Sequence, residues 1–141
     1  KLIFLVVRQR YERQLLENIK REISVDPRPW LYKFYLNCFS KADQEGLAWF
    51  RKNLFKEYLE QLGSDELLRG LDYLANHALF AKALVKVKDI SIFHGRDDRI
   101  APVKEILEIK ADLPQARFKL LADRGHLCFL NRDFRESFYH E

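Results

Sequence analysis

The sequence has no methionine, only two cysteines and no long apolar run. Two cysteines, Cys38 and Cys128, are too few for a disulfide framework, so the composition predicts a protein of the reducing cytoplasm. The longest apolar run, residues 2–7, is far shorter than the roughly 20 residues that a membrane-spanning helix requires. We therefore expect no membrane segment.

Charge of one sign is not concentrated anywhere either. The chain has 25 lysines and arginines against 21 aspartates and glutamates, and the net charge of +4 is spread along its length. Nucleic-acid-binding domains usually cluster basic residues or carry a recognisable motif, and neither is present. The composition, 48% hydrophobic and 33% charged, fits one globular domain or part of one. The mild basic excess favours an acidic protein partner over a nucleic acid.

What the sequence does contain is an apolar beginning. Residues 1–7, KLIFLVV, are typical of a strand that is buried on both faces of a parallel sheet. Such a strand has a neighbour on each side. The rest of the chain can supply one neighbour, so we expect the other upstream of Lys1, in an N-terminal portion of the same fold.

A block of helices is expected next. Apolar residues recur at helical spacing over 11–23, and the segment 26–29, Asp-Pro-Arg-Pro, predicts the end of that helix. A second apolar face follows, and a third helix is expected over 47–62. Gly63 is predicted to end this third helix as a left-handed cap, and Ser64 to cap a fourth.

The pattern changes after this helical block. Short apolar runs over 90–93 and 118–121 flank a helical pattern over 103–113. The order strand, helix, strand predicts two parallel strands with a right-handed crossover. A terminal helix is expected over 131–139.

Ionisable side chains follow both of these strands. Asp97 and Asp98 come directly after the first strand, and Gly125 and His126 come after the second. The carboxyl ends of neighbouring parallel strands lie at one edge of a sheet, so an aspartate and the histidine can meet there. A carboxylate bonded to one imidazole nitrogen fixes the tautomer and leaves the other nitrogen free as a base. Asp97 is the second candidate for the acid, and Asp98 could instead only bind loop amides.

These residues carry a resemblance to a known family. Residues 94–102 match the pattern His-Gly-x-x-Asp-x-Ile-x-Pro, and Gly125-His126 is followed by an apolar Phe129, as in the C-terminal end of α/β-hydrolases. The resemblance implies that Asp98 is the acid and His126 the base of a catalytic triad.

The same resemblance implies a fold class and an organisation along the chain. The expected fold is α/β, the C-terminal part of an α/β-hydrolase fold, with about three parallel strands and a helical lid inserted after the first strand. In this partial domain 1–10 holds a core strand, 11–85 the lid region, and 86–141 a C-terminal βαβα segment with the Asp and His loops.

The third member of a triad is absent from the sequence. Members of this family carry the nucleophile in a Gly-x-Ser-x-Gly turn. None of the five serines has these flanking glycines: Ser24, Ser40, Ser64, Ser91 and Ser137. The resemblance therefore implies a carboxylic ester hydrolase with an acyl-enzyme mechanism, whose nucleophile lies outside this chain, so the chain alone should be inactive. The alternative is a non-catalytic hydrolase remnant or binding module.

A fainter resemblance concerns the substrate. The runs FYLNCF at 34–39 and Gly-Leu-Asp-Tyr-Leu at 70–74 resemble the esterases that act on pimeloyl-[acyl-carrier-protein] methyl ester in biotin synthesis. This resemblance implies an ester carried on acyl carrier protein, which would dock on basic lid residues. Aromatic lid residues could be core or could line an acyl pocket; the candidates for substrate binding are Trp30, Phe34, Phe39, Trp49 and Phe50.

The remaining histidines and cysteines are assigned structural positions. No spacing of His, Cys, Asp and Glu is typical of a metal site, so we predict no metal and no cofactor. His94 is expected to pack beneath the Asp98 loop, and Cys128 to be a small buried residue. His77 and His140 are expected at the surface.

Overall fold

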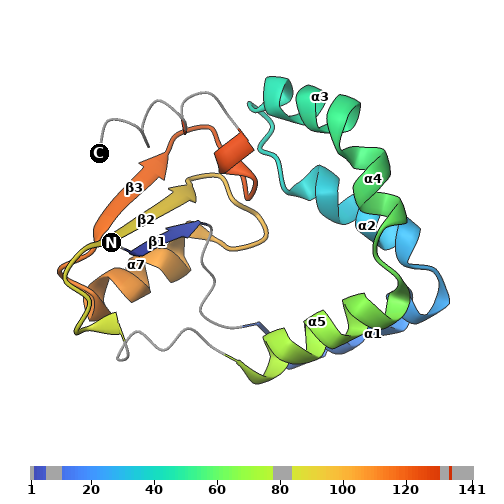
Figure 1. Cartoon of the computed structure of the whole chain (residues 1–141), viewed down its shortest axis with the longest axis horizontal. Coiled ribbons are helices and arrows are strands. Elements are labelled where there is room, and N and C mark those ends of the chain that lie inside the picture. The colour runs from blue at the N-terminus through green and yellow to red at the C-terminus, as the bar shows by residue number, and fades with distance from the viewer. Residues whose placement is uncertain (1, 6–10, 78–83, 131–133, 135–141) are drawn as a thin grey trace.

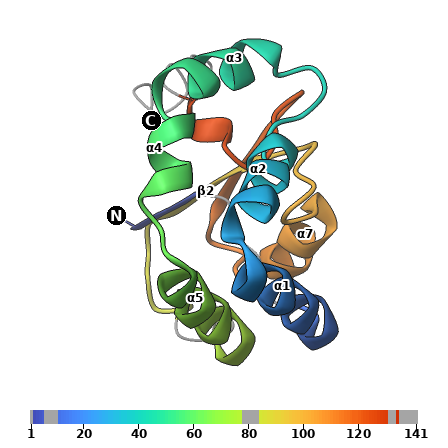
Figure 2. The same ribbon diagram turned by 90° about the vertical axis from the view of Figure 1, so that its right-hand side faces the viewer.

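Figure 1 shows a computed structural model of the chain, which describes residues 2–5, 11–77, 84–130 and 134. A small sheet with one helix beside it occupies one side, and the lid helices curve around the other side. Figure 2, turned by 90°, shows α3 (Gln44–Asn53) and α4 (Phe55–Glu60) on one side of the sheet edge and α1 (Arg13–Val25) with α5 (Ser64–Asn76) on the other. Of the helices described, none is long and apolar enough to cross a membrane.

The sheet has three parallel strands in the order β1-β2-β3. The strands are β1 (Leu2–Leu5), β2 (Ile90–Gly95) and β3 (Arg117–Leu121). β2 lies in the centre and all its residues are buried, as its continuous apolar pattern predicts. The expected α/β fold with three parallel strands and an inserted helical region after the first strand is confirmed.

The crossover helix α7 (Val103–Asp112) connects β2 to β3 and supplies the main core beside the sheet. Ile90 and Ile92 of β2 are at most 1% exposed, and they pack with residues of α7 and its end that are fully buried: Ile106, Ile109 and Leu113. Each such side chain stabilises the fold by about 1.5–3 kcal/mol when it leaves water. This packing holds the two strands whose ends carry the ionisable residues.

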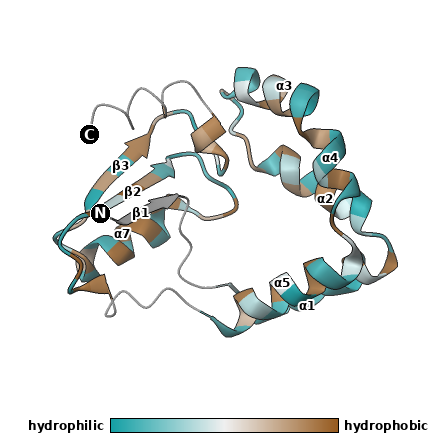
Figure 3. Cartoon of the chain, viewed as in Figure 1, coloured by the Kyte–Doolittle hydropathy of each residue, from teal (hydrophilic) through white to brown (hydrophobic). Residues whose placement is uncertain are grey.

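Five helices lie in the part of the region between β1 and β2 that the structure describes. They are α1 (Arg13–Val25), α2 (Pro27–Asn37), α3 (Gln44–Asn53), α4 (Phe55–Glu60) and α5 (Ser64–Asn76). Figure 3 shows hydrophobic and hydrophilic residues alternating along α5, as in a helix that buries one face, and α1 likewise buries Leu16 and Ile23. Two cores result, one between α1 and α5 and one among α2, α3 and α4.

The segment 26–29 ends α1, as predicted, and begins α2 at once. Asp26 has an extended backbone, and its carboxylate accepts a hydrogen bond from the Arg28 amide at 3.1 Å. Pro27 occupies the first position of α2, where a missing amide hydrogen costs nothing. Aspartate followed by proline therefore both stops one helix and caps the next.

Two predictions about the helix ends are wrong. Gly63 is no left-handed cap, because its φ is −75° and it precedes α5 as the N-cap. Ser64 is already the first residue of α5, and its hydroxyl donates to the Ile23 carbonyl at 3.2 Å, which ties α5 to α1. The expected third helix is also interrupted at Leu54, whose backbone leaves the helical region between α3 and α4. The apolar spacing continues through this break and so does not reveal it.

The C-terminal segment is described only at Phe134. Its ring contacts Phe93 of β2 edge-to-face, with 5.2 Å between ring centroids. The predicted helix over 131–139 and the surface position of His140 otherwise lie outside the described residues.

Two glycines allow three backbone segments to meet beyond the carboxyl ends of β2 and β3. A Cβ atom at Gly95 would overlap the carbonyls of Arg124 and Gly125, and one at Gly125 would overlap the Cys38 carbonyl and approach the Ser40 nitrogen to 2.8 Å. Both glycines have ordinary negative φ angles, so they are required for space and not for an unusual backbone conformation. The two strand ends and the 38–40 segment therefore form one tightly packed unit.

We expect Gly95→Ala to lower the free energy of unfolding by at least about 3 kcal/mol, because backbone atoms cannot move aside as a flexible side chain can. Gly70→Ala in the exposed interior of α5 is the matched control. A methyl group at this position would meet open space, so the substitution should raise stability by about 0.5–1 kcal/mol. Urea unfolding measures both, and equal stabilities for the two variants would contradict the close packing.

Candidate active site

Asp98 lies in the loop after β2 with its side chain fully buried. Its Oδ1 accepts hydrogen bonds from the backbone amides of Ile100 and Ala101, both at 2.8 Å. These bonds fix the plane of the carboxylate and provide part of the solvation that burial removes. Asp98 therefore does bind loop amides, which was the alternative role expected from the sequence, but both amides bind Oδ1 and leave Oδ2 for another partner.

The second oxygen of Asp98 faces His126. The distance from His126 Nδ1 to Asp98 Oδ2 is 2.9 Å. A carboxylate can only accept a hydrogen bond, so Nδ1 carries the proton and Nε2 holds the free lone pair. The His126 side chain is 17% exposed, which allows a reactant to reach it. This geometry can accept a proton at Nε2 and stabilise the resulting imidazolium.

Backbone hydrogen bonds between the two loops hold this pair together. The amide of Arg96 donates to the Leu121 carbonyl and the amide of Asp97 to the Arg124 carbonyl, each at 2.9 Å. These bonds continue the pairing of β2 with β3 past the last paired residues, Gly95 and Leu121. The loops that carry Asp98 and His126 are therefore extensions of one sheet edge, as the strand order predicts.

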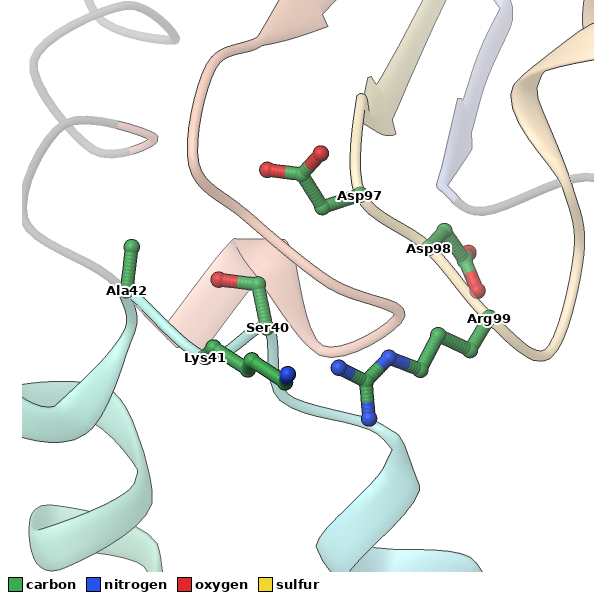
Figure 4. A pocket seen from close by; sticks show the side chains of 6 residues that line it. All are labelled: Ser40, Lys41, Ala42, Asp97, Asp98 and Arg99. Carbon is green, nitrogen blue, oxygen red and sulfur yellow. The ribbon is translucent and has the colours of Figure 1, made fainter.

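Asp97 does not take the place of Asp98. Its side chain is exposed, and in Figure 4 its carboxylate points away from that of Asp98. The carboxylate that is hydrogen-bonded to His126 is that of Asp98. Of the two candidates for the acid, the structure brings only Asp98 to the histidine.

His94 lies beneath the loop, as expected, and has a larger part than its sequence context suggests. It is completely buried, its Nε2 is 2.8 Å from the Ala101 carbonyl and 3.6 Å from Asp98 Oδ2. Burial lowers the pKa of His94 below its usual value, which outweighs the opposing effect of the hydrogen bond to Ala101. A neutral ring with the proton on Nε2 donates to Ala101 and so supports the turn that holds Asp98.

The two cysteines are buried and unreactive. Burial raises the pKa of both Cys38 and Cys128 to about 12, and the nearby Asp98 charge adds to the shift. The prediction that Cys128 is a buried small residue holds, since its exposure is 0%. Across the described part of the chain, no group of His, Cys, Asp and Glu could hold a metal ion.

A depression of about 450 Å³ lies beside the Asp98 loop (Figure 4). One wall comes from the segment between α2 and α3, and the other from the loop after β2. It is lined by Ser40, Lys41, Ala42, Asp97, Asp98 and Arg99. The sequence does not predict that residues 40–42 lie here, because contact between loops that are distant in the chain leaves no local pattern.

The five aromatic lid residues that are candidates for substrate binding differ in how deeply they are buried. Phe39 and Phe50 are 3% and 1% exposed and form the core of α2, α3 and α4, with Phe34 and Trp30 partly buried against it. Trp49 is 44% exposed. None of the five lines the depression beside Asp98. The core interpretation therefore describes Phe39 and Phe50, and a role in substrate binding stays a prediction.

Solved structures show which class of protein has this fold. No family model matches the sequence, and no curated protein is significantly similar to it. The fold is that of the C-terminal part of an α/β-hydrolase, because structures of this class align with almost the whole chain. The chain spans about half the length of these proteins.

Three of these structures illustrate the match. An esterase from Exiguobacterium antarcticum aligns with a TM-score of 0.76 at 22% identity, over 99% of this chain and 54% of its own. A bromoperoxidase from Bacillus anthracis gives 0.77 at 18% identity, over 92% and 49%. MGS-M2, an α/β hydrolase enzyme from a Medee basin deep-sea metagenome library, gives 0.75 at 15% identity, over 98% and 52%.

The lowered pKa of His94 predicts a pH dependence of stability. Above about pH 6.5 this histidine is neutral in both folded and unfolded chains, so its contribution is fully present. Below that pH the unfolded chain binds a proton that the folded chain takes up only at lower pH, so stability falls. Urea unfolding should show that the free energy of unfolding falls less on acidification in His94→Gln than in the parent chain. The glutamine side chain keeps a hydrogen-bond donor near the Ala101 carbonyl. His77→Gln, at an exposed position, should keep the parent's dependence; an unchanged dependence in both variants would contradict the assignment.

Proposed function

We propose that this chain supplies the acid and base of a serine-type carboxylic ester hydrolase, with Asp98 as the acid and His126 as the base. The observation that carries the proposal is the 2.9 Å contact between His126 Nδ1 and a buried Asp98 oxygen whose partner oxygen is held by two amides. The α/β-hydrolase fold and the esterases among its structural neighbours support it.

In the proposed reaction, His126 Nε2 removes the proton from a serine hydroxyl as the serine oxygen attacks the ester carbonyl carbon. The carbonyl oxygen becomes an oxyanion, and its collapse breaks the bond to the leaving alcohol, which takes the proton from Nε2. Water then attacks the acyl-enzyme by the same two steps and releases the carboxylic acid. Asp98 stabilises the imidazolium present during both steps.

The nucleophilic serine would come from another part of the fold. The sequence has no Gly-x-Ser-x-Gly turn. Ser40 is buried and its hydroxyl is bound to the Asp123 carbonyl, and Ser91 is buried within β2. With both cysteine pKa values near 12, a thiolate is no substitute. We propose that the region upstream of β1, which would also give this strand its second neighbour, carries the serine and the oxyanion hole.

The test begins with the coding sequence upstream of Lys1. An in-frame Gly-x-Ser-x-Gly within about 20–30 codons is expected, since a helix and its loops need this length. In the longer polypeptide, Asp98→Asn should lower kcat for a short-chain nitrophenyl ester on the order of 10³–10⁴-fold, because the histidine loses its orienting acceptor. Asp97→Asn, one residue away and unbound to His126, is the matched control and should stay within about twofold.

Two results would count against the proposal. Equal losses in the Asp98 and Asp97 variants would show that the carboxylate at His126 has no special part. A longer reading frame without the serine turn would favour the alternative, a hydrolase remnant or binding module.

The finer proposal concerns the ester. The sequence resemblance points to pimeloyl-[acyl-carrier-protein] methyl ester, and the basic lid side chains that would meet an acidic carrier are all exposed: Arg51, Lys52, Lys56 and Arg69. Arg51, Lys52 and Lys56 are on the adjacent helices α3 and α4, where exposed cations can steer an acidic partner toward the site. Arg69 is on α5, and its guanidinium is 2.9 Å from the Glu66 carboxylate.

Charge reversal tests this docking. Arg51→Glu with Lys56→Glu should raise KM for the carrier-linked ester roughly tenfold or more at low salt and leave a free methyl ester unaffected. Lys104→Glu with Lys110→Glu on α7, two positions outside the lid, is the control, because it changes the net charge by the same amount. Unchanged turnover of the carrier-linked ester in the double variant would rule out this docking surface.

A further inference from the structure

The segment 38–43, which joins α2 to α3, lies against the loop that carries His126. We call it the clasp segment. In Figure 1 it approaches the short helix η1 (Cys128–Leu130), which directly follows that loop. Figure 4 shows Ser40 to Ala42 of the clasp segment on one side and Asp97 to Arg99 on the other. The lid and the sheet therefore meet at the residues that surround the proposed base.

Three polar contacts join the clasp segment to this loop on both sides of His126. The Leu127 amide donates to the Cys38 carbonyl at 3.1 Å. The Ser40 hydroxyl donates to the Asp123 carbonyl at 2.6 Å, and Arg124 Nη1 lies 3.5 Å from Asp43 Oδ1. The residues bound are one, two and three positions from the histidine. The backbone that carries its imidazole is thus held by the lid.

Ser40 is the central residue of this contact. It is only 5% exposed, and its oxygen also accepts a hydrogen bond from the Asp43 amide at 3.1 Å. One hydroxyl therefore connects the start of α3 to the His126 loop. Its partner, Asp123, has φ of 58°, and of the described residues other than glycine it alone has a positive φ. Such a conformation persists only where the surroundings hold it.

The remaining contacts leave little freedom. Any Cβ atom at Gly125 would overlap the backbone of 38–40, so the loop rests directly on the clasp segment. The Asp43 and Arg124 side chains are 1% and 18% exposed, so water screens their attraction only weakly. Because Asp43 is the N-cap of α3, the start of this helix is bound directly to the loop that carries His126.

We infer that Ser40 is a positioning residue for His126: through the Asp123 carbonyl it holds the imidazole against Asp98 and couples the lid to the base. The inference deepens the proposed function and rests on it. Ser40 does not touch the reacting atoms, so its effect appears in the geometry of His126.

NMR of the 141-residue chain tests this directly. The readouts are the His126 Nδ1 proton, which the hydrogen bond to Asp98 shifts to low field and protects from solvent, and the Leu127 amide. In Ser40→Ala both protons should exchange with solvent about tenfold faster, the factor expected for loss of one buried hydrogen bond.

Ser64→Ala is the matched control. Its partly buried hydroxyl also bonds a distant carbonyl, that of Ile23, at 3.2 Å, but within the lid. A general loss of stability would affect both serine variants alike, whereas positioning affects only Ser40→Ala. If Ser40→Ala fails to fold, Ser40→Thr and Ser40→Val are compared in its place. Threonine and valine have nearly the same shape, and only threonine keeps the hydroxyl. Threonine should retain the slow exchange and valine should lose it.

The outcomes separate the two proposals. Equal exchange rates in the Ser40→Ala and Ser64→Ala variants, or in the threonine and valine pair, would overturn the positioning role and leave the Asp98 and His126 pair intact. Absence of the low-field proton in the parent chain would overturn the pair, and with it both proposals.

Discussion

The structure depends on the close approach of three backbone segments at Gly95 and Gly125. No side chain separates the end of β2 from the loop after β3, or that loop from the segment between α2 and α3. Backbone atoms in direct contact have few alternative arrangements, in contrast to side chains that can change rotamer. The positions of Asp98 and His126 are therefore set mainly by the main chain, which explains how a lid and a sheet can form one site.

Burial of Asp98 places a second demand on this region. A buried carboxylate is costly unless donors surround it. The Ile100 and Ala101 amides donate to Asp98 Oδ1, and the His126 ring donates to Oδ2. The buried His94 ring is also close to Oδ2. All of these groups belong to the loop itself or to the adjacent strand ends. The arrangement that would serve proton transfer is thus also what makes an ionised side chain tolerable inside the protein.

Some of these features could be predicted from the sequence and others could not. The ends of β2 and β3 could be predicted because the apolar spacing changes there. The ionisable residues Asp98 and His126 in the loops that follow marked the candidate site. The start of α2 was visible in its Asp-Pro pair. By contrast, the break at Leu54 lies within an unbroken apolar spacing, and Gly63 fits either end of a helix.

Contacts between distant residues were also invisible. Ser40 and Asp123 are brought together by the whole lid, and nothing near either residue in the sequence indicates it. The aromatic lid residues gave an ambiguous pattern because a core and a pocket wall need the same side chains; burial assigns Phe39 and Phe50 to the core.

The two thiols have a practical consequence for studying motion. Cys38 accepts the Leu127 amide on its carbonyl, and Cys128 begins the short helix after the His126 loop, so each reports on one side of the same junction. With pKa values raised to about 12 and no exposure to water beyond 1%, neither can be alkylated while the junction is closed. The rate of alkylation in the native chain then measures how often the structure around the two thiols opens to solvent.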